Sequence, residues 1–161
     1  MATTSSTHAS GEPSPKPAAI QIALETHNFQ PLEALAAWQA GQSPPAAEAQ
    51  FIGRVRGSCA DGSPLRALEL EHYPGMTERL LAQLALAAAQ RHGANAVLVV
   101  HRVGLVAPAE AIVLVAVAAD RRGPAQRCCG ELLEALKHEA PFWKREWGAS
   151  CGQWLQGNTP L

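Results

Sequence analysis

The sequence has few charged residues and no strong excess of either sign. Charged residues make up 17% of the 161 positions, and the formal net charge is -1. General nucleic-acid-binding proteins usually carry a marked basic excess, so this class is disfavoured and any basic site must be local. Hydrophobic residues reach 47%, which is typical of globular chains, and the length suits one domain with a two-layer core.

The sequence also lacks the usual signals for metals, cofactors and membranes. The cysteines form no Cys-x-x-Cys pair and have no histidine at zinc-ligand spacing, so we expect no metal site, and no cofactor motif is present. No apolar run reaches the ~20 residues that cross a bilayer. The first residues lack the basic start and apolar centre of a signal peptide. We therefore expect a cytoplasmic protein without a membrane partner.

The four cysteines are interpreted as small core or surface residues, with a redox or sulfur-carrying role as the alternative. They are Cys59, Cys128, Cys129 and Cys151. Without a secretory signal, a reducing compartment is the natural assumption.

Residues 1–17 are rich in Ser, Thr and Pro and offer almost nothing to bury, so they predict a disordered leader. The rest of the chain, residues 18–161, is expected to form the functional domain. No internal repeat is visible.

Hydrophobic periodicity predicts strands and helices in an order that does not repeat as β-α-β. The expected elements are a strand at 20–24, a helix at 31–40, an extended segment at 49–56, a half-buried strand at 68–73, a helix at 76–91, apolar strands at 96–103 and 111–118, and a helix at 124–139. The two apolar strands predict a central antiparallel hairpin buried on both faces. The fold class is therefore α+β, with an antiparallel or mixed sheet and helices packed on one side.

Two lysines flank a proline-broken turn near the end of the chain. Pro141 must stop the preceding helix, and Phe142 and Trp143 are expected to anchor the turn so that Lys144 points back toward Lys137. Two neighbouring ammonium groups suppress each other's protonation, and one could then act as an acid, base or nucleophile. The alternative is an amphipathic helix that ends in a solvated basic turn.

Basic residues occur at four places beside the ends of predicted elements. They are Arg54 with Arg56, Arg121 with Arg122, Lys137, and Lys144 with Arg145. If these places converge, arginines would grip a phosphorylated substrate and lysines would exchange protons; taken singly, each arginine is a solvated strand end. The histidines His72 and His101 are interpreted as structural polar residues and not as ligands.

Four motifs in the same order resemble one known family. They lie at 53–56, 70–78, 101–104 and 137–146, and the last contains the unbroken run Ala-Pro-Phe-Trp-Lys-Arg-Glu. From about residue 20 to its end, the chain resembles the large, catalytic subunit of molybdopterin synthase, the MoaE family.

The resemblance implies an α/β-hammerhead-like single domain and a sulfurtransferase in molybdenum cofactor biosynthesis. Such proteins form a homodimer that binds a small ubiquitin-like sulfur-carrier subunit at each end, giving a heterotetramer. The partner's C-terminal Gly-Gly thiocarboxylate donates sulfur to cyclic pyranopterin monophosphate, and two transfers complete the dithiolene of molybdopterin.

The resemblance also implies roles for individual residues. Lys137 and Lys144 match the catalytic lysines, and the implied substrate-binding residues are Arg54, Val55, Arg56, Asp120, Arg121, Lys137, Lys144, Arg145 and Glu146. The family usually has histidine where Asp120 stands, and a carboxylate there would oppose an anionic substrate unless an arginine pairs with it. Asp120 favours one alternative, a non-catalytic paralogue that serves as a scaffold. A second alternative is a phosphate-ester or nucleotide-binding module, in which the arginines bind and the lysines perform no chemistry.

Overall fold

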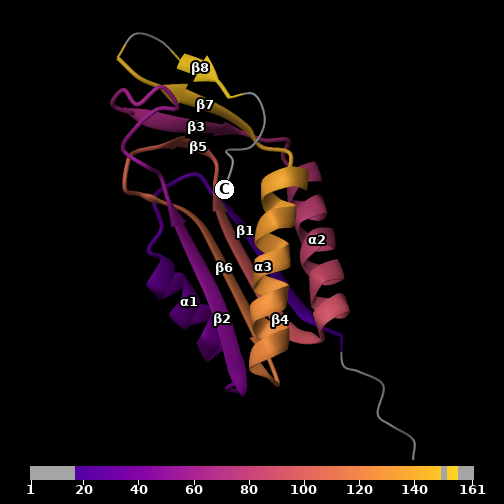
Figure 1. Cartoon of the computed structure of the whole chain (residues 1–161). Helices are drawn as coiled ribbons and strands as arrows, with labels where there is room; N and C mark the ends of the chain where they lie inside the picture. Colours follow the sequence, from indigo (N-terminus) through magenta and orange to yellow (C-terminus); the bar gives the residue numbers. More distant parts are fainter. Residues whose placement is uncertain (1–16, 150–151, 156–161) are drawn as a thin grey trace, which may run out of the picture.

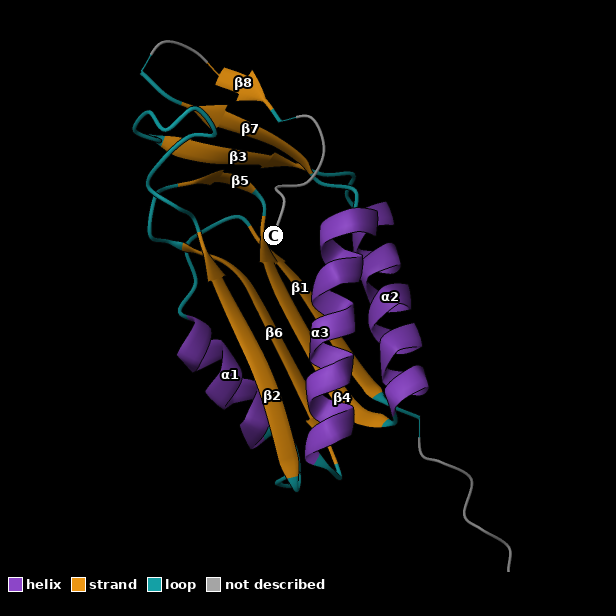
Figure 2. Ribbon diagram, in the orientation of Figure 1, coloured by secondary structure: helices purple, strands orange, loops and turns teal. Residues whose placement is uncertain are grey.

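A computed structural model describes residues 17–149 and 152–155, which form eight strands and three helices (Figures 1 and 2). In chain order these are β1 (Ala19–Glu25), α1 (Pro31–Ala40), β2 (Ala47–Arg54), β3 (Ala67–Glu71), α2 (Met76–His92), β4 (Ala94–Arg102), β5 (Gly104–Val106), β6 (Ala111–Ala119), α3 (Arg122–Glu139), β7 (Trp143–Trp147) and β8 (Gly152–Trp154). All of the predicted leader except Pro17 lies outside the described residues.

The larger sheet is mixed and has the strand order β1-β4-β6-β2. β1 runs parallel to β4, whereas β6 is antiparallel to both β4 and β2. The β-branched, apolar strands β4 and β6 lie at the centre and are almost entirely buried. The predicted antiparallel pairing of 96–103 with 111–118 is therefore confirmed.

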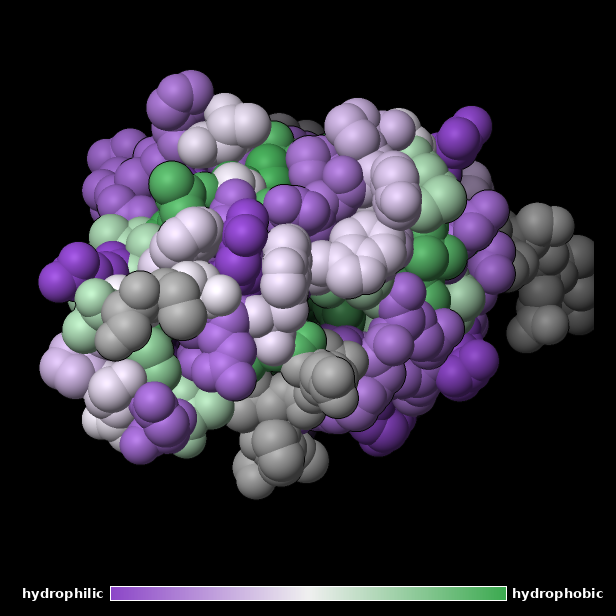
Figure 3. Space-filling model, turned by 90° about the horizontal axis from the view of Figure 1, so that it is seen from above, coloured by the Kyte–Doolittle hydropathy of each residue, from purple (hydrophilic) through white to green (hydrophobic). Residues whose placement is uncertain are grey.

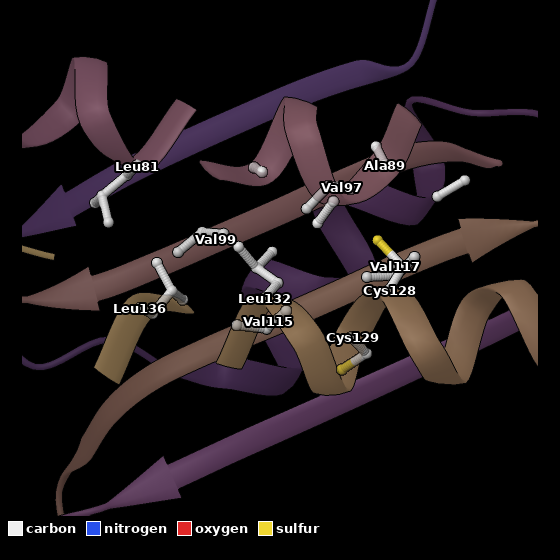
Figure 4. Close-up of a cluster of buried hydrophobic side chains, with 13 residues drawn as sticks. Leu81, Ala89, Val97, Val99, Val115, Val117, Cys128, Cys129, Leu132 and Leu136 are labelled. Atoms are coloured by element: carbon white, nitrogen blue, oxygen red, sulfur yellow. The ribbon is translucent and has the colours of Figure 1, made fainter. Parts of the chain in front are cut away.

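Helices cover both faces of this sheet, so the prediction of helices on one side is wrong. α2 and α3 pack on one face around side chains such as Val97 and Val115 (Figure 4). On the opposite face, Leu35 and Trp38 of α1 pack against Leu98 and neighbouring strand residues. The reason is physical: a central strand that is apolar on both faces needs a covering layer on each side.

The second sheet is antiparallel, has the order β5-β3-β7-β8, and lies across one end of the larger sheet (Figure 1). The two-sheet arrangement confirms the α+β fold of hammerhead type. Residues 143–147 form a strand in this sheet, so the alternative of a solvated basic turn is wrong. Seen from that end, hydrophilic and hydrophobic side chains are intermixed across the surface (Figure 3).

The predicted element boundaries are close to the observed ones. The largest shift at a helix is at the start of α3, which begins at Arg122, two positions before the predicted Pro124. The three short strands β5, β7 and β8 had no counterpart in the prediction. None of the helices in the described part of the chain is both long and apolar enough to cross a membrane.

Gly93 ends α2 in the left-handed conformation, with φ 68°, and donates its N–H to the carbonyl of Ala89. A Cβ at this position would meet no neighbouring atom, so the backbone angle alone opposes a side chain. We expect Gly93→Ala to lower the free energy of unfolding by about 1 kcal/mol. Urea denaturation measures this change.

Gly130 supplies the matched control because it lies inside α3, where a Cβ would also meet no atom but the backbone is helical. Gly130→Ala should raise the free energy of unfolding by up to about 1 kcal/mol. If both substitutions change the free energy of unfolding equally, the positive φ of Gly93 does not explain the destabilisation.

Candidate active site

The end of α3 and the start of β7 bring the two lysines to one place. Lys137 lies in the last turn of α3, which ends when Ala140 adopts an extended conformation before Pro141. The N–H of Phe142 donates to the carbonyl of Ala140 at 2.8 Å and tightens the connection. Lys144 then follows on β7. The proline that ends the helix therefore also sets where the second lysine lies.

Lys137 and Lys144 both line a cavity of about 340 Å³, which we call the lysine cavity. Its walls are largely apolar: Phe51, Ile112, Val113, Leu133, Leu136, Ala140 and Phe142, with His101 and Glu134 completing the lining. Burial lowers the pKa of the Lys144 ammonium, and the charge of Lys137 lowers it further. The expected approach of Lys144 to Lys137 is confirmed. Lys144 thus loses a proton more readily than an exposed lysine.

A second cavity of about 200 Å³, which we call the arginine cavity, adjoins the first. It is lined by Arg54, Val55, Arg56, Leu65, Leu68, Ile112, Lys144, Glu146 and Leu155. Because Lys144 and Ile112 line both cavities, the predicted arginine segment at 54–56 is brought next to the lysine pair. An anion held by the arginines would therefore lie beside the lysine amines.

Glu146 is a buried carboxylate in the wall of the arginine cavity. The residue is 4% exposed, and its carboxylate accepts hydrogen bonds from Arg56 Nη2 at 3.0 Å and from the Ala60 N–H at 2.9 Å. Glu146 thus ties the strand end at Arg56 to the loop that follows. A carboxylate that is already paired with a guanidinium opposes a bound anion less than a free one.

Arg145 differs from its neighbours because alternation along β7 turns its side chain to the other face. Its guanidinium pairs with Glu69 at 2.8 Å and lies over the rings of Trp147 and Trp154, at 4.7 and 4.4 Å from their centroids. It lines neither the lysine cavity nor the arginine cavity. The structure therefore gives the Arg145 side chain a role in holding the second sheet together.

Asp120 and Arg121 lie immediately before α3, and Lys137 lies in the last turn of that helix. An 18-residue helix is about 27 Å long, so one chain does not bring these two residues to its own lysine cavity. The carboxylate of Asp120 accepts a hydrogen bond from Asn95 Nδ2 at 2.7 Å. The predicted convergence of basic residues therefore holds for 54–56, Lys137 and Lys144, and not for 120–122 of the same chain.

His101 is a residue of the lysine cavity that the sequence interpretation left aside as merely structural. Burial lowers its pKa to about 4, the hydrogen bond to the Arg102 carbonyl opposes this shift, and the charge of Lys144 adds to it. The imidazole is therefore neutral at pH 7. In the sequence, His101 lies beside Arg102 at the end of a predicted buried strand, 36 positions before Lys137. Nothing in that position predicts that the two side chains line the same cavity.

The neutral His101 predicts a dependence of stability on pH. Between pH 6.5 and about 4 the unfolded chain binds a proton at this histidine and the folded chain does not. The free energy of unfolding should therefore fall as pH falls through this window, by roughly 3 kcal/mol from this residue. The free energy of unfolding is measured against pH for wild type and His101→Phe, and the difference between the two curves gives the contribution of His101. Parallel curves would contradict the prediction.

The cysteines of the described residues are free, and Cys151 lies outside that part of the chain. Burial raises the pKa of the Cys128 and Cys129 thiols to about 11. Both are therefore protonated at neutral pH, which disfavours a nucleophilic role and supports their interpretation as core residues. Among the described residues no cluster of His, Cys, Asp and Glu could hold a metal ion.

The fold and the two cavities define a class: an α+β protein of hammerhead type with a lysine pair in an apolar cavity beside a pair of arginines. A family profile described as "MoaE protein" matches residues 24–139. The chain belongs to the MoaE family.

Individual relatives agree with this assignment. The chain is 47% identical over 125 residues to the molybdopterin synthase catalytic subunit of Ralstonia nicotianae, covering 78% of this chain and 70% of that protein. It is 42% identical over 135 residues to the catalytic subunit of Caulobacter vibrioides, covering 84% and 88%. The solved structure of the molybdopterin biosynthesis MoaE protein from Burkholderia ambifaria superimposes with a TM-score of 0.70 at 39% identity, covering 88% of this chain and 91% of that one.

Proposed function

We propose that this protein is the catalytic subunit of a molybdopterin synthase and transfers sulfur to cyclic pyranopterin monophosphate. The observation that carries the proposal is the joint lining of the lysine cavity by Lys137 and Lys144, next to the arginine cavity. Two relatives that share 42% and 47% identity with the chain are named molybdopterin synthase catalytic subunits, which supports the proposal.

The arginine cavity fits the anionic part of the substrate. Arginine makes bidentate hydrogen bonds to phosphate, and both Arg54 and Arg56 face this cavity. Arg54 also donates from Nη1 to the carbonyl of Ala109 at 3.1 Å, which holds its guanidinium in place. Phosphate bound here would set the pterin beside Lys144.

The two lysines would then perform the chemistry. The thiocarboxylate sulfur bonds to a substrate carbon as a carbon–oxygen bond of the substrate breaks, and hydrolysis of the resulting thioester returns the partner's tail as a carboxylate. Negative charge develops on oxygen in both steps, and an ammonium group can stabilise it. A lysine whose pKa is lowered, as that of Lys144 is, can also give a proton to the leaving oxygen and take one back more readily than an exposed lysine. We assign oxyanion stabilisation to Lys137 and proton transfer to Lys144.

The sulfur donor would be a small ubiquitin-like subunit with a C-terminal Gly-Gly thiocarboxylate. A tail of small residues can enter the lysine cavity, whose apolar walls exclude water from the thiocarboxylate. The functional domain would span residues 18–161 in a cytoplasmic heterotetramer, with 1–17 as a leader.

The second copy in a homodimer would supply Asp120 and Arg121. The length of α3 keeps these residues away from the lysine cavity of their own chain, so a contribution to substrate binding must come from the neighbouring copy. The hydrogen bond from Asn95 gives the Asp120 carboxylate a partner, which reduces its repulsion of an anionic substrate.

The test is reconstitution of the purified chain with a thiocarboxylated small subunit and cyclic pyranopterin monophosphate. Formation of molybdopterin supports the proposal. A stable complex without product would instead support the non-catalytic scaffold, and binding of phosphate esters without any complex would support the phosphate-binding module. Small subunit ending in an ordinary carboxylate is the matched control, because it can bind but has no sulfur to donate.

A further inference from the structure

His101 is the neutral polar side chain of the lysine cavity, and its ring is held rigidly. The ring stacks on Phe142 with the centroids 4.1 Å apart and the planes 11° from parallel. Nδ1 lies 2.8 Å from the carbonyl oxygen of Arg102. Only 8% of the residue is exposed. Both the plane and the rotation of the imidazole are therefore fixed.

The hydrogen bond to Arg102 determines which ring nitrogen carries the proton. A carbonyl oxygen can only accept, so Nδ1 must be the donor. Because the ring is neutral, Nε2 then has a free lone pair. Among the described residues the ring's one hydrogen bond is at Nδ1, which leaves Nε2 as an acceptor at the cavity wall.

The lysine amines need such an acceptor. A lysine ammonium has three N–H donors, and the apolar walls of the cavity offer none of them a partner. The charged groups that face the cavity are Lys144 from β7 and Lys137 and Glu134 from α3. Glu134 already pairs with His138 at 3.3 Å, and its side chain is half exposed. Lys144 lines the same cavity as His101, and its charge lowers the pKa of the imidazole.

We propose that His101 is a positioning residue: when the Lys144 side chain turns toward the ring across the lysine cavity, its ammonium donates a hydrogen bond to Nε2, and this contact fixes the direction of that amine. The contact stabilises the charged form of Lys144, while burial and Lys137 oppose it. The catalytic consequence rests on the proposed sulfur transfer, but the contact itself does not.

The sequence makes a direct test simple, because it contains only three lysines, Lys16, Lys137 and Lys144. Reductive ¹³C-methylation of the full chain gives one signal for each lysine and one for the amino terminus. Lys137→Ala and Lys144→Ala assign two of these signals. The titration midpoint of Lys144 is then followed by NMR in wild type, His101→Phe and His101→Gln.

Phenylalanine keeps the stack on Phe142 but removes the acceptor, whereas glutamine keeps an acceptor near the position of Nε2. We expect the Lys144 midpoint to move to lower pH in His101→Phe and to return toward the wild-type value in His101→Gln. An unchanged midpoint in His101→Phe, or equal shifts in both variants, would overturn the proposal.

Imidazole ¹⁵N spectra of the unmodified protein test the proposal without any variant. At pH 7 the His101 signals should be those of a neutral ring with hydrogen on Nδ1 and none on Nε2. A charged ring, or hydrogen on Nε2, would overturn the proposal even if the His101 variants fail to fold.

Kinetics separate this proposal from the proposed function. His101→Phe should lower kcat about tenfold with KM little changed, and His101→Gln should recover most of the loss. If wild-type protein forms no molybdopterin, the proposed function fails, while the Lys144 midpoint still decides whether His101 holds the amine.

Discussion

Lys137→Ala is expected to abolish molybdopterin formation, with kcat lowered by about 10²–10⁴-fold. The variant removes one of the two amines of the lysine cavity and leaves the walls almost complete. It removes the proposed stabilisation of negative charge on oxygen during sulfur transfer. It also removes the charge that lowers the pKa of Lys144, so that pKa should rise toward the ordinary lysine value.

The measurement is product formation from cyclic pyranopterin monophosphate with saturating thiocarboxylated partner. Gel filtration should show that Lys137→Ala still forms the complex, because the substitution leaves the surface outside the cavity unchanged. Arg79→Ala is the matched control, since it removes one exposed cation from α2, away from both cavities. Activity of Lys137→Ala within a few-fold of wild type would rule out a catalytic role for this lysine.

Glu110→Ala is expected to lower the free energy of unfolding by about 3–5 kcal/mol. Glu110 Oε2 lies 3.3 Å from Nη1 of Arg102, whose side chain is 3% exposed. The same oxygen accepts a hydrogen bond from the N–H of Ala107 at 3.0 Å. Removal of the carboxylate leaves a buried guanidinium with no charged partner, and its Nε already lacks a hydrogen-bond partner among the described residues.

The effect should reach the arginine cavity. The Glu110 backbone carbonyl accepts the N–H of Val55 at 3.0 Å, and Val55 in turn accepts the N–H of Ala109 at 2.8 Å. Loss of the Glu110 side chain therefore loosens the turn against which the 54–56 segment is fixed. We expect a raised KM for the pterin substrate in addition to the lower stability.

Urea denaturation and steady-state kinetics check both effects. The double variant Arg102→Met with Glu110→Gln is the control, because it removes both charges and keeps an acceptor for Ala107. It should be more stable than Glu110→Ala, since no buried charge is left unpaired. A single variant that loses less than about 1 kcal/mol would show that water reaches Arg102 and satisfies it.

Patterns within a few residues were enough to predict most elements of the larger sheet. The apolar runs of β4 and β6 need burial on both faces wherever they lie, and Gly93 ends α2 because a left-handed residue is least strained as glycine. The same apolar runs already required a covering layer on each face. The prediction of helices on one side overlooked that requirement.

The short strands of the second sheet could not be predicted in the same way. β5 and β8 have three residues each, and β7 consists of aromatic and charged residues, Trp-Lys-Arg-Glu-Trp. No period within such segments favours a strand. β5 and β7 pair with β3, which lies far away in the sequence, and β8 pairs with β7, so only the assembled sheet stabilises these strands.

The sequence by itself determined the family and the α+β class, and it singled out Lys137 and Lys144 as candidate site residues, because motifs, periodicity and a helix-breaking proline are local properties. The tertiary structure decided which side chains share a cavity. It turned Arg145 away, separated Asp120 from Lys137 by the length of α3, and brought His101 to the lysines. The reason is that strand alternation, helix length and sheet register fix where a side chain points only after distant segments have paired.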